Sequence, residues 1–143
     1  MISIENSNRY IYVKNNPMIF TDPSGMICFY NQRIGRMSCS GPGSGNGYSG
    51  TGPGRNNPDY NSVPFVGPTP RACYIVGELI PTSNLGPNIR QLTPVDTFPS
   101  DTRDPSTIYM HGNNSSNDAS KGCMIMPPQT RTDIPTGEMI CVY

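Results

Sequence analysis

Cys73-Tyr74-Ile75-Val76 is a run of aromatic and β-branched residues of the kind that favours a β-strand. Further short apolar runs follow toward the C-terminus, with Pro or Gly between them, at residues 107–110, 124–126 and 139–143. None of them has the 3.6-residue period of an amphipathic helix, and the repeated prolines between residues 68 and 105 oppose long helices. We therefore predict a mostly β fold, with a small β-rich domain over residues 63–143.

The overall composition excludes several classes of protein. The chain has 143 residues, of which 16 are Pro and 15 are Gly, and only 14% are charged, so a long-helix bundle or coiled coil is excluded. Ten Lys and Arg balance ten Asp and Glu, which argues against binding to nucleic acid or to an anionic membrane. No apolar run has the length of a membrane span or a signal peptide. We expect neither membrane insertion nor export by the chain's own signal.

The N-terminal half divides by composition into two segments. Residues 1–36 alternate short strand-like runs with turns, such as Asp22-Pro23-Ser24-Gly25, in which Pro and Gly hold turn positions. From Gly41 to Gly54, seven of fourteen residues are Gly. Such a segment cannot offset its ordering entropy by burying side chains. We interpret residues 37–62 as a flexible linker.

The five cysteines show no C-x-x-C spacing, and the chain has a single His, so a Cys/His zinc site is a poor interpretation and no metal or cofactor is expected. An odd number leaves at least one cysteine outside any intramolecular bridge. A bridge such as Cys73 to Cys141 would require an oxidising compartment, and the sequence alone does not assign it.

One segment places a strong nucleophile near a base. His111-Gly112 is followed by a polar loop and then by Ser120-Lys121-Gly122-Cys123. If the two flanking strands are neighbours, His111 and Cys123 lie side by side at the same end of a sheet, where an imidazole can deprotonate a thiol. The N–H groups of Gly122 and Cys123 could then form an oxyanion site.

The strand before this loop predicts how the imidazole is directed. Tyr109 and His111 share one face, and Ile108 and Met110 share the other, so His111 ends the strand with its ring toward solvent or a cleft. No carboxylate is close in sequence, so we expect a backbone carbonyl to orient the ring. The competing interpretation is a buried structural thiol beside an incidental surface His.

Residues 8–26 resemble the end of the core of RHS, or YD-repeat, proteins. The resemblance lies in Asn8-Arg9-Tyr10-Ile11-Tyr12-Val13-Lys14-Asn15-Asn16-Pro17 followed by Asp22-Pro23-Ser24-Gly25-Met26. In that family a self-cleaving aspartyl protease acts at such a D-P-x-G motif, and a variable C-terminal toxin follows. The resemblance implies release after Met26, with Asp22 and Gly25 in the cleavage motif.

Most of residues 63–143 resemble the L,D-transpeptidase-like effectors delivered by type VI secretion. The resemblance lies in Gly67-Pro68-Thr69-Pro70, Tyr74-Ile75, Arg103, Ile108-Tyr109-Met110-His111-Gly112 and Ser120-Lys121-Gly122-Cys123-Met124. It implies a β-rich fold with Cys123 as nucleophile and His111 as general base, and with Ser120, Gly122 and Gly112 in supporting positions. Arg103 could pair with a substrate carboxylate. The sequence departs from related enzymes at Lys121, where a second His is common, and at Ala72, where Gly is common.

Together the two resemblances imply a polymorphic toxin that acts on peptidoglycan stem tetrapeptides by L,D-carboxypeptidase or L,D-transpeptidase chemistry. The expected partners are stem peptides, a cognate immunity protein, the parent RHS core and the secretion machinery, and the expected site of action is the periplasm of a target bacterium. The alternative is a non-catalytic adhesion or interaction tip on an RHS scaffold. A papain-like protease fits less well, because its nucleophile lies at a helix start ahead of the His.

Overall fold

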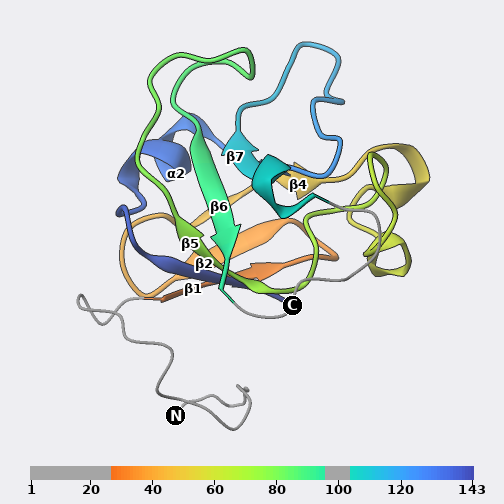
Figure 1. Ribbon diagram of the computed structural model, residues 1–143, viewed down its shortest axis with the longest axis horizontal. Helices are drawn as coiled ribbons and strands as arrows, with labels where there is room; N and C mark the ends of the chain where they lie inside the picture. The colour runs from red at the N-terminus through yellow and green to blue at the C-terminus, as the bar shows by residue number, and fades with distance from the viewer. Residues whose placement is uncertain (1–26, 96–103) are drawn as a thin grey trace, which may run out of the picture.

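The computed structural model describes residues 27–95 and 104–143. Within these ranges the structure is a nine-stranded sheet curled into a nearly closed barrel, with little helix, which confirms the prediction of a mostly β fold (Figure 1). The strands, in chain order, are β1 Ile27–Asn31, β2 Arg36–Cys39, β3 Gly45–Asn46, β4 Tyr48–Ser49, β5 Cys73–Val76, β6 Arg90–Pro94, β7 Tyr109–His111, β8 Met124–Ile125 and β9 Met139–Val142. The helical elements are the short 3₁₀ turns Gly52–Gly54, Pro58–Tyr60 and Pro105–Thr107 and the six-residue helix α2, Pro128–Asp133.

The order of strands across the sheet is β3-β2-β1-β9-β5-β6-β7-β8-β4. The two edge strands, β3 and β4, are consecutive in the chain and are joined only by Gly47. The pairs β1–β9 and β7–β8 are parallel, and the other pairs are antiparallel. The chain therefore closes the barrel by passing from one edge of the sheet to the other at a single residue.

The hydrophobic core fills the barrel interior and is contributed by strands from both halves of the chain. Its fully buried side chains include Tyr30 and Met37 from the first hairpin and Tyr74, Met110 and Met124 from later strands. Every other residue of β1 and β5 is buried, as expected for strands with one face toward a core.

The predicted division into an N-terminal fragment, a linker and a C-terminal domain is wrong for the described residues. β1 pairs along its length with β9, so residues 27–36 belong to the same sheet as the C-terminus. Residues 37–62 are not a flexible linker, because they form the end of β2, strands β3 and β4 and two 3₁₀ turns, and Tyr48 and Ser49 are buried. The glycines order this segment by allowing backbones to approach closely: a Cβ at Gly47 would overlap the carbonyl of Ile125, and one at Gly54 would overlap that of Val66.

Two disulfides join cross-strand neighbours. Cys28 is bonded to Cys39 between β1 and β2, and Cys73 to Cys141 between β5 and β9; in each pair the two residues are register partners. The second bridge is the one considered from the sequence. The first was not anticipated, because Cys39 lay in the presumed linker.

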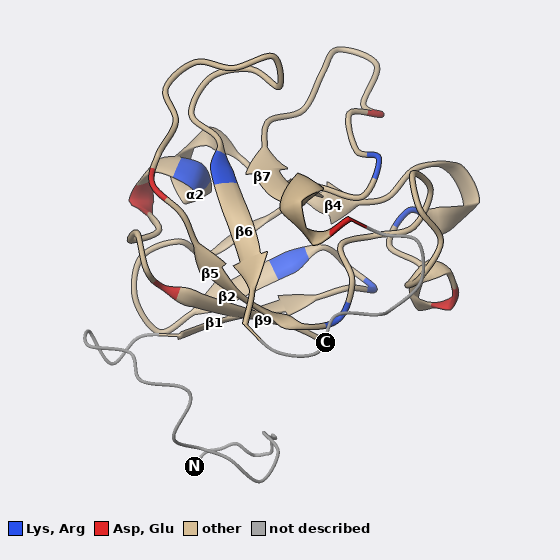
Figure 2. Ribbon diagram, viewed as in Figure 1, with Lys and Arg blue, Asp and Glu red and all other residues tan. Residues whose placement is uncertain are grey.

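Charged residues are distributed over many separate elements (Figure 2). Among the described residues, no helix has the length and apolarity needed to cross a membrane.

We predict that the two disulfides contribute unequally to stability. The Cys73–Cys141 bridge spans 68 residues and the Cys28–Cys39 bridge spans 11, so loop-closure entropy assigns about 4 kcal/mol to the first and about 3 kcal/mol to the second. Urea unfolding of the Cys73→Ala/Cys141→Ala and Cys28→Ala/Cys39→Ala proteins measures the difference. A larger loss of unfolding free energy on removing the short bridge would contradict this ranking.

Candidate functional site

His111 and Cys123 lie on the outer face of two neighbouring strands. Met110 on β7 and Met124 on β8 belong to the core, so the alternation of side chains directs His111 and Cys123 to the opposite face. The pairing sets His111 opposite Ile125, and continuing this register by one residue sets Cys123 opposite Tyr109. The two residues are thus diagonal neighbours, two positions apart along the pair.

The prediction that the two flanking strands are neighbours is confirmed, but their expected direction is wrong. β7 and β8 run parallel, so the end of β7 and the start of β8 lie at opposite ends of the pair. The displacement between His111 and Cys123 along the strands stays small, because β7 has only three residues and β8 only two. The connecting residues 112–123 run back along the strands before β8 begins.

The environment of His111 favours its neutral form. The side chain is only 4% exposed and does not line the neighbouring pocket, so the prediction that the ring is directed toward solvent or a cleft is wrong. Burial lowers the pKa of His111 below its usual value, and the nearby Arg131 guanidinium lowers it further. The ring Nδ1 lies 2.9 Å from the Gly112 carbonyl oxygen. A carbonyl only accepts, so Nδ1 carries the proton and Nε2 holds the lone pair of a base. The prediction that a backbone carbonyl orients the ring is confirmed.

Cys123 is the one cysteine of the five that takes part in no disulfide, and all five lie in the described residues. Its side chain is partly exposed, and its Sγ lies 3.5 Å from the carbonyl oxygen of Thr107, within the range of a weak S–H donor. The thiol is therefore accessible from solvent on the face that His111 shares.

Three buried hydroxyls hold the backbone at Cys123. Ser49, Thr69 and Ser120 have no exposed surface and come from three separate segments; we call them the hydroxyl cluster. Ser49 Oγ and Ser120 Oγ each donate to the Cys123 carbonyl at 2.7 Å. Thr69 Oγ1 donates to the Gly122 carbonyl at 3.0 Å and lies 2.9 Å from Ser49 Oγ.

The hydroxyl cluster gives Ser120 and Gly122 structural roles. Gly122 has φ of +118°, a conformation that favours glycine. Its N–H donates to Ser120 Oγ at 3.2 Å, so this N–H is engaged inside the protein and does not serve the oxyanion site expected from the sequence. Ser120 Oγ also accepts from the N–H of Gly50, at 2.8 Å, and thereby ties the Cys123 loop to the glycine-rich segment.

Tyr48 fixes the rest of the loop between β7 and β8. Its hydroxyl donates to Asn113 Oδ1 at 2.6 Å and accepts from the N–H of Ala119 at 2.8 Å. Arg55 covers the Tyr48 ring at 3.5 Å from its centroid and donates to the Asn117 carbonyl at 2.7 Å. Both ends of the polar loop are thus attached to residues that sequence reasoning assigned to the linker.

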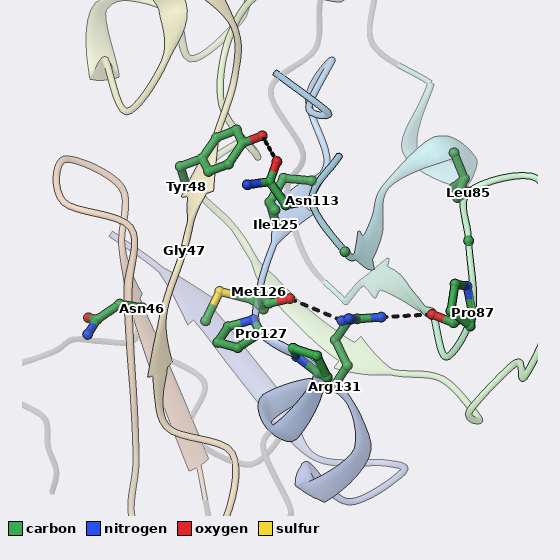
Figure 3. Close-up of a pocket in the computed structure, with 13 residues that line it drawn as sticks. Asn46, Gly47, Tyr48, Leu85, Pro87, Asn113, Ile125, Met126, Pro127 and Arg131 are labelled. Carbon is green, nitrogen blue, oxygen red and sulfur yellow. Dashed lines mark hydrogen bonds between the residues drawn. The ribbon is translucent and has the colours of Figure 1, made fainter. Parts of the chain in front are cut away.

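A pocket of about 450 Å³ opens beside this loop. Gly112, Asn113 and Tyr48 form part of its wall together with Arg131 of α2 (Figure 3). Gly112 follows His111 directly in the chain, and its carbonyl orients the imidazole. The pocket wall therefore includes the residue next to the candidate base.

Some of the predicted residues cannot be placed. Arg103, and the autocleavage residues Asp22, Gly25 and Met26, lie outside the described residues. Sequence reasoning missed Ser49, Tyr48 and Arg131, and gave Thr69 no role, although the Gly67-Pro68-Thr69-Pro70 motif marked its position. Among the residues that the structure describes, no group of three or more His, Cys, Asp or Glu side chains is arranged to hold a metal ion.

No family model, curated protein or solved structure significantly matches this chain. The resemblances to RHS cores and to L,D-transpeptidase-like effectors therefore stay predictions, and the case for a function depends on the geometry around Cys123.

We predict that Thr69→Val destabilises the protein by about 1–3 kcal/mol, because it leaves the buried Gly122 carbonyl and the Ser49 hydroxyl without this partner while conserving shape. Urea unfolding measures the loss. Thr69→Ser keeps the hydroxyl, and Thr132→Val removes an exposed one on α2; both should lie close to wild type. If Thr69→Val unfolds at the same urea concentration as Thr132→Val, the hydroxyl cluster does not hold this loop.

Proposed function

We propose that this protein is an antibacterial effector that cleaves or exchanges the terminal D-amino acid of peptidoglycan stem tetrapeptides, with Cys123 as nucleophile and His111 as general base. The observation that carries the proposal is the pairing of β7 with β8, which sets a partly exposed thiol diagonal to a buried, neutral imidazole on one face of the sheet. The sequence resemblance supplies the class of substrate.

In the proposed reaction His111 Nε2 takes the proton of the Cys123 thiol, and the thiolate attacks the carbonyl carbon of the third stem residue. A C–S bond forms, and the tetrahedral intermediate then expels the terminal D-amino acid by breaking the C–N bond. The imidazolium returns its proton to the leaving amine. Water or an amine next attacks the thioester; the new C–O or C–N bond replaces the C–S bond, and the thiol regains its proton.

The disulfides support an extracytoplasmic site of action. Structural disulfides persist in oxidising compartments such as the bacterial periplasm, where peptidoglycan stems are exposed. We propose that an RHS core and a type VI secretion machine deliver the protein to the periplasm of a target cell, and that the producer carries an immunity protein. The alternative, a non-catalytic interaction tip, has no specific observation in its favour.

We predict that Cys123→Ala abolishes conversion of tetrapeptide muropeptides and that His111→Gln slows it by about 10²- to 10⁴-fold, because these changes remove the nucleophile and the base. Mass spectrometry of the products measures conversion and distinguishes hydrolysis from exchange. Lys121→Ala, an exposed change in the same loop, is the matched control and should keep activity.

Conversion of muropeptides by the folded Cys123→Ala protein would contradict the proposal. Failure of the folded wild-type protein to process any tetrapeptide would contradict it as well, and would leave the non-catalytic interaction tip as the better interpretation.

A further inference from the structure

Arg131 is a buried cation without an acidic partner in the described residues. Its side chain is 6% exposed, and its guanidinium is held by backbone carbonyls: Nε donates to Met126 at 3.0 Å, and Nη1 donates to Pro87 at 2.7 Å and Asn88 at 3.1 Å (Figure 3). Carbonyl dipoles orient a buried guanidinium but carry no opposite charge, and buried charges in proteins are normally paired. The site therefore favours an anion.

The second terminal nitrogen of Arg131 is the part of the guanidinium that a ligand could use. No hydrogen bond within the described part of the chain engages the two N–H groups of Nη2. A Cβ added at Gly112 would lie 2.9 Å from Nη2, so the guanidinium packs closely against the Gly112 backbone and any side chain there would displace it. Both residues line the same pocket of about 450 Å³.

Arg90 shows what a purely structural arginine looks like in this protein. It is 3% exposed and lies at the start of β6, within hydrogen-bond distance of α2. Each of its nitrogens is engaged: Nε donates to the Arg131 carbonyl, Nη1 to the Gly77 carbonyl and Thr136 Oγ1, and Nη2 to the Ile134 carbonyl. Arg90 does not line the pocket. The two buried arginines thus differ at Nη2, and only that of Arg131 adjoins the pocket.

The pocket walls match a short peptide end with both polar and apolar parts. Amide groups come from Asn46 and Asn113, and apolar surface comes from Leu85, Ile125 and Pro127. The close-up shows Asn113 and Arg131 on opposite sides of Ile125 and Met126 (Figure 3). A small ligand with one carboxylate fits this wall better than a polyanion, because Arg131 is the only charged residue among the described residues that line it.

We propose that this pocket binds the carboxylate of the terminal D-amino acid of the stem peptide, with Arg131 Nη2 as its counter-ion; this rests on the proposed function. One carbon separates the carboxylate of an amino acid from its amine. A carboxylate at Nη2, beside Gly112, would therefore hold the leaving amine near His111, the neighbouring residue, which returns a proton to it. Arg131 thereby acts on substrate binding and on orientation of the scissile amide.

Calorimetric titration of the Cys123→Ala protein, which binds without turnover, tests the pocket directly. The two probes are L-Ala-γ-D-Glu-meso-diaminopimelyl-D-Ala and the same peptide with a C-terminal carboxamide. We expect the carboxamide to bind at least about tenfold more weakly, because it loses the charge-assisted hydrogen bonds to Arg131. Adding Gly112→Ala should abolish this preference, because its Cβ would lie 2.9 Å from Nη2 and displace the guanidinium. Lys121→Ala, an exposed change in the same loop that does not line the pocket, should preserve it.

Equal affinity for the two peptides, or no detectable binding of either at millimolar concentration, would overturn the pocket proposal. A preference for the acid that survives Gly112→Ala in a folded protein would overturn it too. Product analysis with the Cys123-containing protein distinguishes failure of the pocket proposal from failure of the proposed function. Equal KM values for the acid and the carboxamide would contradict only the pocket. Absence of product despite preferential binding of the acid would contradict only the chemistry.

Discussion

Closure of the barrel at Gly47 is the constraint on which the candidate site depends. This residue alone joins the edge strands β3 and β4, and its backbone lies so close to the carbonyl of Ile125 that no side chain fits between them. β4 can pair with β8 only because the chain crosses at this point. The crossing sets Tyr48 and Ser49 next to the strand that begins just after Cys123.

The conformation at Cys123 follows from that closure. Ser49, delivered by β4, joins Thr69 and Ser120 around the carbonyls of Gly122 and Cys123, while Tyr48 holds the loop that follows His111. Buried hydroxyls are costly unless they are hydrogen-bonded, so the cluster favours one arrangement of this backbone over others. These hydrogen bonds thus fix the backbone that bears the Cys123 thiol, although the loop before it is long and polar.

Strands of the barrel were predictable where their signals are local. The run at Cys73–Val76 forms a strand with the expected bounds, whereas His111, expected to face solvent or a cleft, is buried by contacts that the alternation around Met110 does not predict. The composition of residues 37–62 could not show that this segment is structurally ordered. Glycines that allow close backbone contact and glycines of a flexible tether look alike in a sequence. The parallel pairing of β7 with β8 depends on contacts made elsewhere in the barrel. Arg131 lies in the polar stretch Pro128–Asp133, which gives no sign of being buried.

The rate at which iodoacetamide alkylates Cys123 at pH 7 tests the central claim most directly, because the other four cysteines are in disulfides and peptide mass mapping identifies the modified residue. An ordinary thiol is mostly protonated at this pH and reacts slowly, whereas a neutral His111 that accepts the thiol proton as the sulfur attacks the reagent would speed the reaction. The account predicts that the wild-type protein is alkylated at least about tenfold faster than the folded His111→Gln protein at pH 7, and that the difference narrows at pH 10. Equal rates for the two proteins at pH 7 would contradict it.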